Sequence, residues 1–416
     1  MGVLCTPITP YCGQPTTVIP RDPFDLCNPI HRPYDIILHV IEYKEHILAD
    51  PRIEKFAQIL VNHSAKIQPG DRVLIESTTA AEPLVRALYA NILELGGHPH
   101  LELEFPDQTA LFYQHANPSQ LDFTPTFRKL AYDEFESRIR IHSETNPRAL
   151  THISPERQAR HQKALSPILA AQMQRGAAKE FKWVTTLFPT QAYAEEAKMD
   201  YERYQDFVYK ACFADEETAD PVAAWKTFET RQQKIIQQIE GHDTVELRGP
   251  NVELTLSIKD RTFKNSFGEH NMPDGEIYTG PVESSLNGWV RYTYPAITGG
   301  RVVEGVELTF EDGCVTQATA ATNQGFLNEM LNTDPGARYV GEFAIGTNYQ
   351  IDRFIGHILF DEKIGGTFHM ALGAGYPETG SQNKSAIHWD MICDLHEDSQ
   401  ISVDGDVIYR NGRFTI

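Results

Sequence analysis

The spacing of apolar residues changes at about residue 242, and this change restricts the folds that the chain can adopt. Upstream of it, apolar residues at helical spacing alternate with short apolar runs. Val85, Leu88 and Ile92 mark one face of an expected helix, and residues 181–188 form an expected strand. Alternation of helices and strands at these lengths predicts an α/β N-terminal domain with a mostly parallel sheet.

Downstream of this point, short strands alternate apolar and polar residues and end in turns rich in glycine, asparagine and aspartate. Asp404-Gly405 and Asn411-Gly412 are typical of tight β-hairpin turns. One helix is expected, over residues 323–332. The pattern predicts a β-rich C-terminal domain with strands at 244–247, 252–258, 302–310, 315–320 and 401–416.

The chain therefore divides into an arm and two expected domains. Residues 1–42 are rich in proline, threonine and cysteine without a clear period, which indicates an irregular N-terminal arm. The α/β domain is expected over residues 43–242 and the β-rich domain over residues 243–416. A chain of 416 residues, of which 41% are hydrophobic, is long enough to form domains with cores of their own.

Charge and composition exclude several classes of partner. The net charge of −20 and the lack of a lysine or arginine run argue against nucleic acid. No apolar run approaches the ~20 residues of a membrane span and no secretory signal is visible, so we expect a cytoplasmic protein without a membrane partner. The six cysteines lack C-x-x-C spacing, which favours reduced thiols. No glycine motif typical of phosphate binding is present, so no nucleotide cofactor is expected.

Acidic residues stand within apolar segments of the last third of the chain. Glu342 shares a strand face with Ala344, whereas Phe343 and Ile345 point to the opposite face. Glu276 follows a tight turn directly and would be aimed by it, although an ordinary acidic turn also fits this residue when it is taken alone. A carboxylate in such surroundings needs compensation for its burial.

Two histidines accompany these acids. His388 and Asp390 are two residues apart, so they lie on the same side of an extended segment and can reach one metal ion. His369 lies in an apolar run, where a hydrogen-bonded core histidine is the common alternative, and Glu362 could belong to a solvated turn. Together the acids and imidazoles make an oxygen-rich ligand set that suits two divalent metal ions.

Five motifs in order resemble the aminopeptidase T and aminopeptidase S family of metallopeptidases, also called the thermophilic aminopeptidase family. The similarity covers about residues 45–416 and rests on the segments NMPDGEIYTGP, GEFAIG, FDEKIGGTFHMALG, GAGYPE and SAIHWD. It implies an exopeptidase site in the C-terminal domain, with Tyr376 as a catalytic hydroxyl. Glu276 and Glu342 are implied both as ligands and as candidates for proton transfer. The implied metal ligands are Glu276, Glu342, Glu362, His369, His388 and Asp390.

The resemblance also implies cofactors and partners. Two divalent metal ions per chain are expected, with zinc first and cobalt, manganese or magnesium also compatible with carboxylate and imidazole ligands. The expected substrates are peptides with a free N-terminus. A homodimer is expected from the family and from the long N-terminal arm, which could cross to a neighbouring subunit.

Two other functions remain open from the sequence. The first is a mononuclear non-haem iron oxygenase, in which His388 and Asp390 join His369 or His396 in a two-histidine, one-carboxylate triad. That function leaves the three glutamates without a role. The second is a relative that binds peptides without hydrolysing them. The number of metal ions per chain separates the peptidase from the oxygenase.

Overall fold

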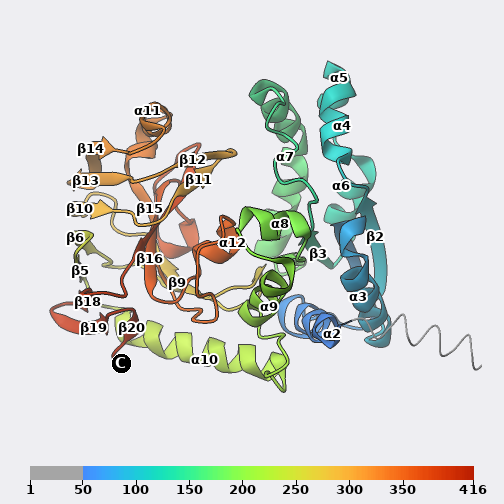
Figure 1. The fold of residues 1–416 in the computed structure, drawn as a ribbon, viewed down its shortest axis with the longest axis horizontal. Helices are drawn as coiled ribbons and strands as arrows, with labels where there is room; N and C mark the ends of the chain where they lie inside the picture. The colour runs from blue at the N-terminus through green and yellow to red at the C-terminus, as the bar shows by residue number, and fades with distance from the viewer. Residues whose placement is uncertain (1–49) are drawn as a thin grey trace, which may run out of the picture. The chain divides into compact units, whose positions relative to one another are not determined.

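A five-stranded sheet organises the first half of the described chain. The computed structural model describes residues 50–416, so the arm predicted at residues 1–42 lies outside them (Figure 1). The strands run parallel in the order β2-β1-β3-β4-β8. They are β1 (Arg72–Thr78), β2 (His98–Glu104), β3 (Ser137–His142), β4 (Lys182–Leu187) and β8 (Asn271–Met272). The predicted α/β part with a mostly parallel sheet is confirmed.

Helices cover both faces of this sheet. They are α2 (Pro51–Gln58), α3 (Glu82–Glu94), α4 (Gln108–His115), α5 (Pro118–Leu121), α6 (Thr126–Glu134), α7 (Pro155–Ala177), α8 (Gln191–Glu196), α9 (Tyr201–Ala211) and α10 (Pro221–Ile239), with a π-helical turn η1 (Ile59–Ser64) and a 3₁₀ turn η2 (Thr79–Ala81). Val73 and Ile75 of β1 belong to the cluster formed with α2 and α3, whereas Leu74 belongs to the cluster formed with α6 and α7. Burial on both faces explains why the central strands are apolar throughout.

Helix α3 shows how local sequence determines an element. Pro83 lies in its first turn, where the missing N–H costs no hydrogen bond. Leu84, Leu88 and Ile92 form its buried face. The helix ends before Gly96, which has a φ of 79° and so adopts the left-handed conformation that glycine tolerates best. The spacing of apolar residues predicted this helix.

The second half of the chain is β-rich, as predicted. It contains an eight-stranded sheet in the order β14-β13-β10-β6-β5-β18-β19-β20 and a five-stranded sheet in the order β17-β16-β15-β9-β7. Both sheets contribute to one apolar core, the first with residues such as Leu254 and the second with residues such as Phe343. Strands β11 and β12 form a separate pair. The strands are β5 (Thr244–Gly249), β6 (Val252–Ser257), β7 (Lys264–Ser266), β9 (Glu276–Thr279), β10 (Asn287–Arg291), β11 (Ala296–Thr298), β12 (Arg301–Val303), β13 (Glu307–Glu311), β14 (Cys314–Thr319), β15 (Val340–Gly346), β16 (Thr367–Gly373), β17 (His388–Asp394), β18 (Gln400–Val403), β19 (Asp406–Arg410) and β20 (Arg413–Phe414).

The helical segments of this half are few and short. They are α11 (Gln324–Leu331), α12 (Ile358–Asp361), η3 (Pro335–Arg338) and η4 (Pro377–Thr379). The helix expected over residues 323–332 is thus present as α11. The single strand expected over residues 302–310 is wrong, because the chain breaks there into β12 and β13. Gly305, with a φ of 63°, turns the backbone between them.

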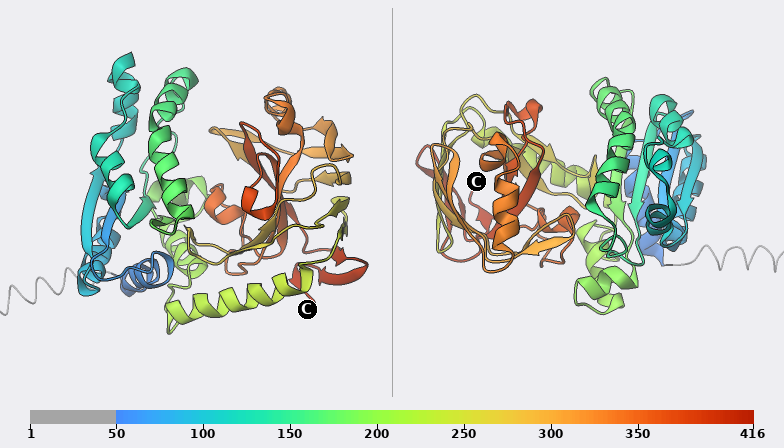
Figure 2. Two further views of the ribbon diagram at one scale, coloured as in Figure 1. Left: turned by 180° about the vertical axis from the view of Figure 1, so that it is seen from behind. Right: turned by 90° about the horizontal axis from the view of Figure 1, so that it is seen from above.

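Two segments connect the two sheets. Helix α10 runs along one edge of the molecule from α2 to the strands of the β-rich half, as Figures 1 and 2 show. The short strand β8 pairs with β4, and a few residues later β9 pairs with β15. Residues 50–416 form one compact unit, so the division at residue 242 remains a prediction.

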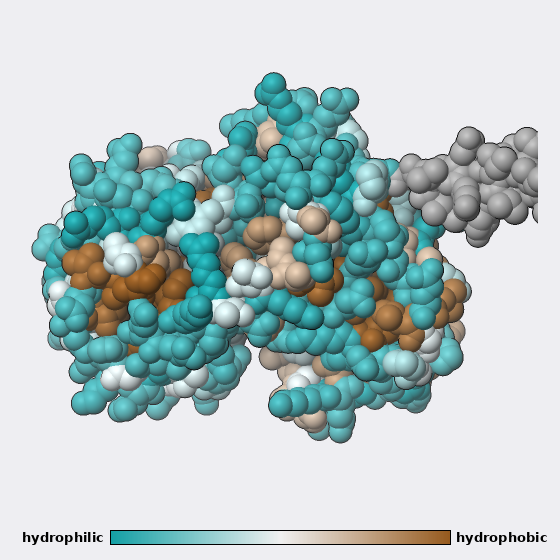
Figure 3. All heavy atoms as spheres, turned by 90° about the horizontal axis from the view of Figure 1, so that it is seen from below, coloured by the Kyte–Doolittle hydropathy of each residue, from teal (hydrophilic) through white to brown (hydrophobic). Residues whose placement is uncertain are grey.

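The surface and the helices agree with the composition. Most of the face in Figure 3 is hydrophilic, with apolar residues in separate patches. Within residues 50–416, no helix combines the length and the apolar character that a membrane crossing requires. In the same part of the chain, Cys212, Cys314 and Cys393 are free thiols.

Candidate metal centre

Neighbouring strands place the predicted ligands on one face of the five-stranded sheet. Strand β15 carries Glu342, β16 carries His369, and β17 carries His388 and Asp390. Glu342 lies opposite Ala371 of β16, and Ala371 lies opposite Asp390 of β17. Residues directly opposite one another in paired strands share a face. The register therefore brings the acids and imidazoles together although they are far apart in the sequence.

The alternate residues of these strands explain why the ligand face is stable. Phe343, Met370 and Met391 point to the other face and belong to the apolar core. Ala344 lies opposite His369, and this small side chain leaves space for the imidazole. One face of these strands therefore packs on the core and the other carries the polar side chains, because successive side chains of a strand point to opposite faces.

The remaining predicted acids reach the same place from outside the central strands. Glu276 is the first residue of β9 and lies opposite Gly346. The turn before it is held by Asp274, whose carboxylate accepts hydrogen bonds from the Gly268 and Gly275 amides. Glu362 directly follows α12. The turn fixes the direction in which the Glu276 carboxylate points.

Ligand atoms of the predicted residues converge within short distances. The Nε2 atom of His369 lies 3.2 Å from a Glu276 carboxylate oxygen and 3.7 Å from one of Glu342. The Nε2 atom of His388 lies 3.3 Å from Glu342 and 3.5 Å from Asp390. Each of three overlapping groups has its ligand atoms within 4.8 Å of one another. The groups are Glu276, Glu342 and His369; Glu342, His388 and Asp390; and Glu362, His369 and Asp390.

Unpartnered polar atoms in this cluster fit a bound cation. Glu276 Oε2, Asp390 Oδ1 and His369 Nδ1 are buried and have no hydrogen-bond partner. Although His369 approaches Glu276 Oε2 closely, the geometry is not that of a hydrogen bond. Buried oxygens of this kind normally have partners, and a metal ion would bind the two carboxylate oxygens.

The second nitrogen of His388 sets the direction of its ring. Its Nδ1 lies 2.8 Å from the carbonyl oxygen of Ala374. An N–H at that position donates to the carbonyl and leaves the Nε2 atom directed at Glu342 and Asp390. Supporting bonds of this type orient metal-binding histidines.

Burial and neighbouring charges shift the pKa values of the acids and imidazoles in the cluster. Burial alone would raise the pKa of Glu276, but the Lys363 ammonium and His369 lower that pKa to about 2. Burial raises the pKa of Glu362 to about 8 despite Lys363. Burial would lower the pKa of His388, but Asp390 and Glu342 raise it to about 11. The cluster therefore attracts positive charge strongly.

Lys363 is a member of the site that sequence reasoning missed. Its side chain is 1% exposed, and its Nζ donates hydrogen bonds at 2.5 Å to both Glu276 and Glu362. The Asp274 carboxylate lies 3.9 Å away. Lys363 stands inside the FDEKIGG segment, directly after Glu362, but nothing in the local pattern indicates that a lysine there is buried.

Tyr376 borders the cluster on its open side. Its side chain is partly exposed, and its ring centroid lies 5.4 Å from those of Tyr278 and His388. Burial, followed by the nearby Glu342 and Asp390 carboxylates, raises the pKa of the Tyr376 hydroxyl. The hydroxyl thus keeps its proton and can donate a hydrogen bond at neutral pH.

His396 lies outside the three groups. Its side chain is 49% exposed, and its Nδ1 lies 2.6 Å from Asp394. Among residues 50–416, none of the three ligand groups contains two histidines. The triad that the oxygenase hypothesis requires is therefore not gathered within the distances that define these groups.

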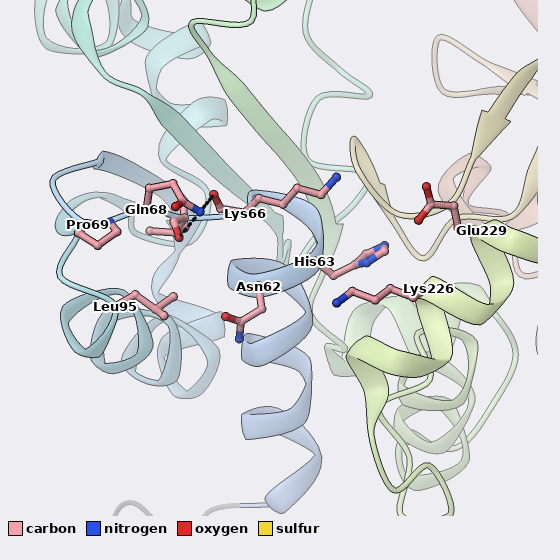
Figure 4. A pocket seen from close by; sticks show the side chains of 9 residues that line it. Asn62, His63, Lys66, Gln68, Pro69, Leu95, Lys226 and Glu229 are labelled. Carbon is pink, nitrogen blue, oxygen red and sulfur yellow. Dashed lines mark hydrogen bonds between the residues drawn. The ribbon is translucent and has the colours of Figure 1, made fainter.

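A separate pocket lies away from the cluster. It has a volume of about 580 Å³ and is lined by residues that include Asn62, Lys66 and Lys226. Figure 4 shows Lys66, which follows η1, and Lys226 of α10 on its walls, together with Glu229 as its one acid. Two ammonium groups and one carboxylate do not make a site for a divalent cation.

Comparisons with known proteins agree on one family. The family model described as thermophilic metalloprotease (M29) matches residues 49–414. Aminopeptidase 2 of Geobacillus stearothermophilus is 28% identical over 411 residues, covering 88% of this chain and 98% of the relative. Aminopeptidase PepS of Streptococcus thermophilus is 27% identical over 421 residues, with the same coverage of 88% and 98%.

Solved structures share the fold. AmpT of Thermus thermophilus matches with a TM-score of 0.76 at 22% identity, covering 88% of this chain and 99% of that one. A 2,5-dihydroxypyridine dioxygenase of Pseudomonas putida KT2440 matches with a TM-score of 0.52 at 12% identity, covering 88% and 96%. A peptidase and an oxygenase therefore share this architecture, so the fold alone does not determine the reaction.

Proposed function

The chain belongs to the M29 family of thermophilic metalloproteases, and on this basis we propose that it hydrolyses the first peptide bond of peptides with a free N-terminus by means of two divalent metal ions. The observation that carries the proposal is the convergence of the predicted acids and imidazoles, with unpartnered buried oxygens on Glu276 and Asp390. As a metallo-aminopeptidase it is a hydrolase, in line with its named relatives.

The charge of the cluster supports two ions rather than one. Four carboxylates meet in the three ligand groups, and when His369 and His388 bind metal as neutral imidazoles, Lys363 supplies one positive charge against these four acids. The surplus negative charge is costly to bury unless cations neutralise it. The proposed ligands are Glu276, Glu342, Glu362, His369, His388 and Asp390, with zinc as the first expectation and cobalt, manganese or magnesium as alternatives.

When bound by these ligands, the two ions would lower the pKa of a water molecule towards neutrality and would polarise the scissile carbonyl. The chain's own residues do the rest. Tyr376 is placed to donate a hydrogen bond to the oxygen of that carbonyl as negative charge develops, a contribution of about 3 kcal/mol for a well-aimed donor. Its raised pKa keeps the donor proton in place.

Carboxylates of the cluster are available for the two other tasks of the reaction. One must receive a proton from the attacking water and transfer it to the leaving amine. Glu276 and Glu342 are the candidates, because both lie in the cluster and are buried from bulk water. The free amino group of the peptide requires a negative partner, which the same acidic cluster provides.

The iron oxygenase remains the second candidate function, favoured by the fold shared with the dihydroxypyridine dioxygenase. It needs only His388, Asp390 and one more histidine, so Glu362 and the two buried glutamates Glu276 and Glu342 would have no role. Such burial without function is costly. About two ions per chain supports the peptidase, and a single redox-active iron supports the oxygenase.

Location and assembly are parts of the same proposal. The free thiols at Cys212, Cys314 and Cys393 support a cytoplasmic enzyme, where cysteines stay reduced. Exposed apolar residues along the edge strand β2, Leu101 and Leu103, support a homodimer. The view in Figure 3 includes an apolar patch on the side of the α/β half.

Hydrolysis of aminoacyl nitroanilides tests the proposal directly. The metal-free protein is reconstituted with zinc, cobalt, manganese or magnesium and assayed beside N-acetylated versions of the same substrates. Cleavage of the free substrates and not of the acetylated ones supports an aminopeptidase. Equal rates on both would remove the requirement for a free N-terminus, and inactivity with every metal would remove the peptidase function.

A further inference from the structure

A pocket of about 260 Å³ opens directly beside the metal centre. Asp390 forms part of its wall, and Ile392 follows on the same face of β17. The pocket therefore begins where the ligand cluster ends. Its volume is below the ~300–1,000 Å³ of pockets that enclose a whole small molecule, so it suits one side chain of a substrate.

Three short segments build the apolar walls of this pocket. Ile297 comes from strand β11 and Ile392 from β17, whereas Phe354 precedes α12 and Ile358 is the first residue of that helix. The ring of Phe354 stacks on Tyr294 with centroids 5.3 Å apart and an angle of 9° between the planes. This stacking holds the aromatic wall in place.

The polar groups of the pocket add little charge outside the metal centre. Burial, followed by His142, lowers the pKa of His357 to about 4, so its imidazole is neutral at neutral pH. The Asp361 carboxylate is buried and accepts a hydrogen bond from the Ile355 amide at 2.8 Å. A carboxylate of a substrate side chain would find no lysine or arginine among these walls, and outside the metal centre an ammonium would meet only Asp361, one oxygen of which is already bound by that amide.

The geometry of the reaction determines which substrate residue lies here. In an aminopeptidase, the free amino group and the scissile carbonyl of the first residue both lie at the metal centre. They are bonded to the same Cα atom, so the side chain on that atom must enter the space next to the ligands. We propose that this pocket receives the side chain of the released residue and that the enzyme prefers peptides beginning with an apolar residue such as leucine or phenylalanine.

This inference rests on the proposed aminopeptidase activity, and kcat/KM on matched nitroanilides tests it separately. Leucine and phenylalanine nitroanilides are expected to exceed those of lysine and glutamate by about 10–100-fold, the range that apolar side-chain contacts supply. Rates on lysine or glutamate that equal or exceed those on leucine would overturn the pocket assignment. Failure on every nitroanilide would instead remove the aminopeptidase function.

Dipeptide pairs locate the preference on the first residue. Leucyl-glycine is expected to be cleaved at least about 10-fold faster than glycyl-leucine, because only the first side chain reaches the pocket. The reverse order would assign the pocket to the second residue and contradict the inference.

A variant of the pocket wall provides the sharpest test. Ile358 is 46% exposed, so Ile358→Glu leaves the core intact while it places a carboxylate on the wall. The ratio of leucine to lysine nitroanilide hydrolysis is expected to fall about 10-fold or more. Ile416→Glu makes the same change at a residue of 48% exposure outside the pocket and should leave the ratio unchanged. An unaltered ratio in both variants would overturn the inference.

Discussion

Lys363 and Glu276 are 87 residues apart in the sequence, yet the ammonium of one donates a hydrogen bond to the carboxylate of the other at 2.5 Å inside the protein. The same ammonium holds Glu362. A buried cation therefore organises two of the proposed ligand carboxylates before any metal is considered. The ion pair connects the start of β9 with the residues that follow α12.

Lys363→Met is expected to destabilise the metal-free protein by about 3 kcal/mol, because it leaves the buried Glu276 carboxylate and the half-buried Glu362 carboxylate without their partner. Urea unfolding without metal measures the change. Lys384→Met makes the same substitution at an exposed lysine and should be close to neutral. Added zinc should restore part of the lost stability, since a cation can replace the ammonium charge. A variant as stable as the native chain would contradict this role of Lys363.

Glu342→Gln is expected to reduce metal content and activity together. Glu342 belongs to two of the ligand groups, so its loss affects the binding of both proposed ions. Activity should fall by at least about 100-fold, at or beyond the upper limit for residues that only support ligands. Metal analysis by mass spectrometry accompanies the assay, with Glu397→Gln at an exposed site as control. Full metal content in the variant would exclude Glu342 as a ligand.

Tyr376→Phe removes one hydroxyl from the border of the cluster. We expect kcat to fall by about 10²-fold with a much smaller change in KM, as for loss of a donor that acts in the transition state. Tyr89→Phe is a matched control, because its side chain is 39% exposed and that of Tyr376 is 38% exposed. An equal effect on kcat in both variants, or a change confined to KM, would argue against this assignment.

Glu136→Gln is expected to destabilise the α/β half by an amount that depends on pH. The Arg72 guanidinium, acting against a smaller effect of burial, lowers the pKa of Glu136 from 4.5 to about 2. Because the folded pKa is below the unfolded one, the stabilisation is complete above pH 4.5 and disappears as the pH falls through about 2. The pair is partly exposed and screened, so we expect about 1 kcal/mol at pH 7.

Unfolding curves of the native chain and Glu136→Gln should therefore converge between pH 4.5 and pH 2. Glu134→Gln is the control, because Glu134 lies 3.6 Å from Arg72 and is 55% exposed. It should be nearly neutral at both ends of the range. A difference that stays constant with pH would show that the carboxylate charge is not the cause.

Leu101→Glu combined with Leu103→Glu tests the proposed homodimer. The two side chains are 47% and 38% exposed and share one face of β2 at the edge of the sheet. Light scattering after gel filtration should show a dimer for the native chain and a monomer for the double variant, because buried like charges repel. A monomeric native chain would contradict the homodimer proposal. A double variant that is still dimeric would show that β2 is not the interface.

Period and composition predicted much of the architecture. The apolar spacing of α3 and the alternation in β15 depend on which face is buried, and that information is local. The placement of Glu342 on the face opposite Phe343 followed from the same alternation. The convergence of Glu342, His369 and Asp390, by contrast, depends on strand register. The sequence showed only that these residues are all suitable metal ligands, not that they lie close together.

Other features could not be predicted because they depend on tertiary contacts. Lys363 is buried because α12 brings it against Glu276, whereas its own sequence neighbours resemble a solvated turn. Strand β8 has two residues, too few for a periodic signal, and exists through its pairing with β4. Helices α8 and α9 pack on residues near α12 that follow much later in the chain.

The position of β8 limits how this enzyme could be divided or recombined. A fragment that begins at residue 243 would keep all the proposed ligands but would lose β4, the strand with which β8 pairs. The segment that directs Glu276 would then have no strand to pair with. Exchange of whole halves between relatives should accordingly succeed only when the first sheet and the acidic cluster come from the same parent.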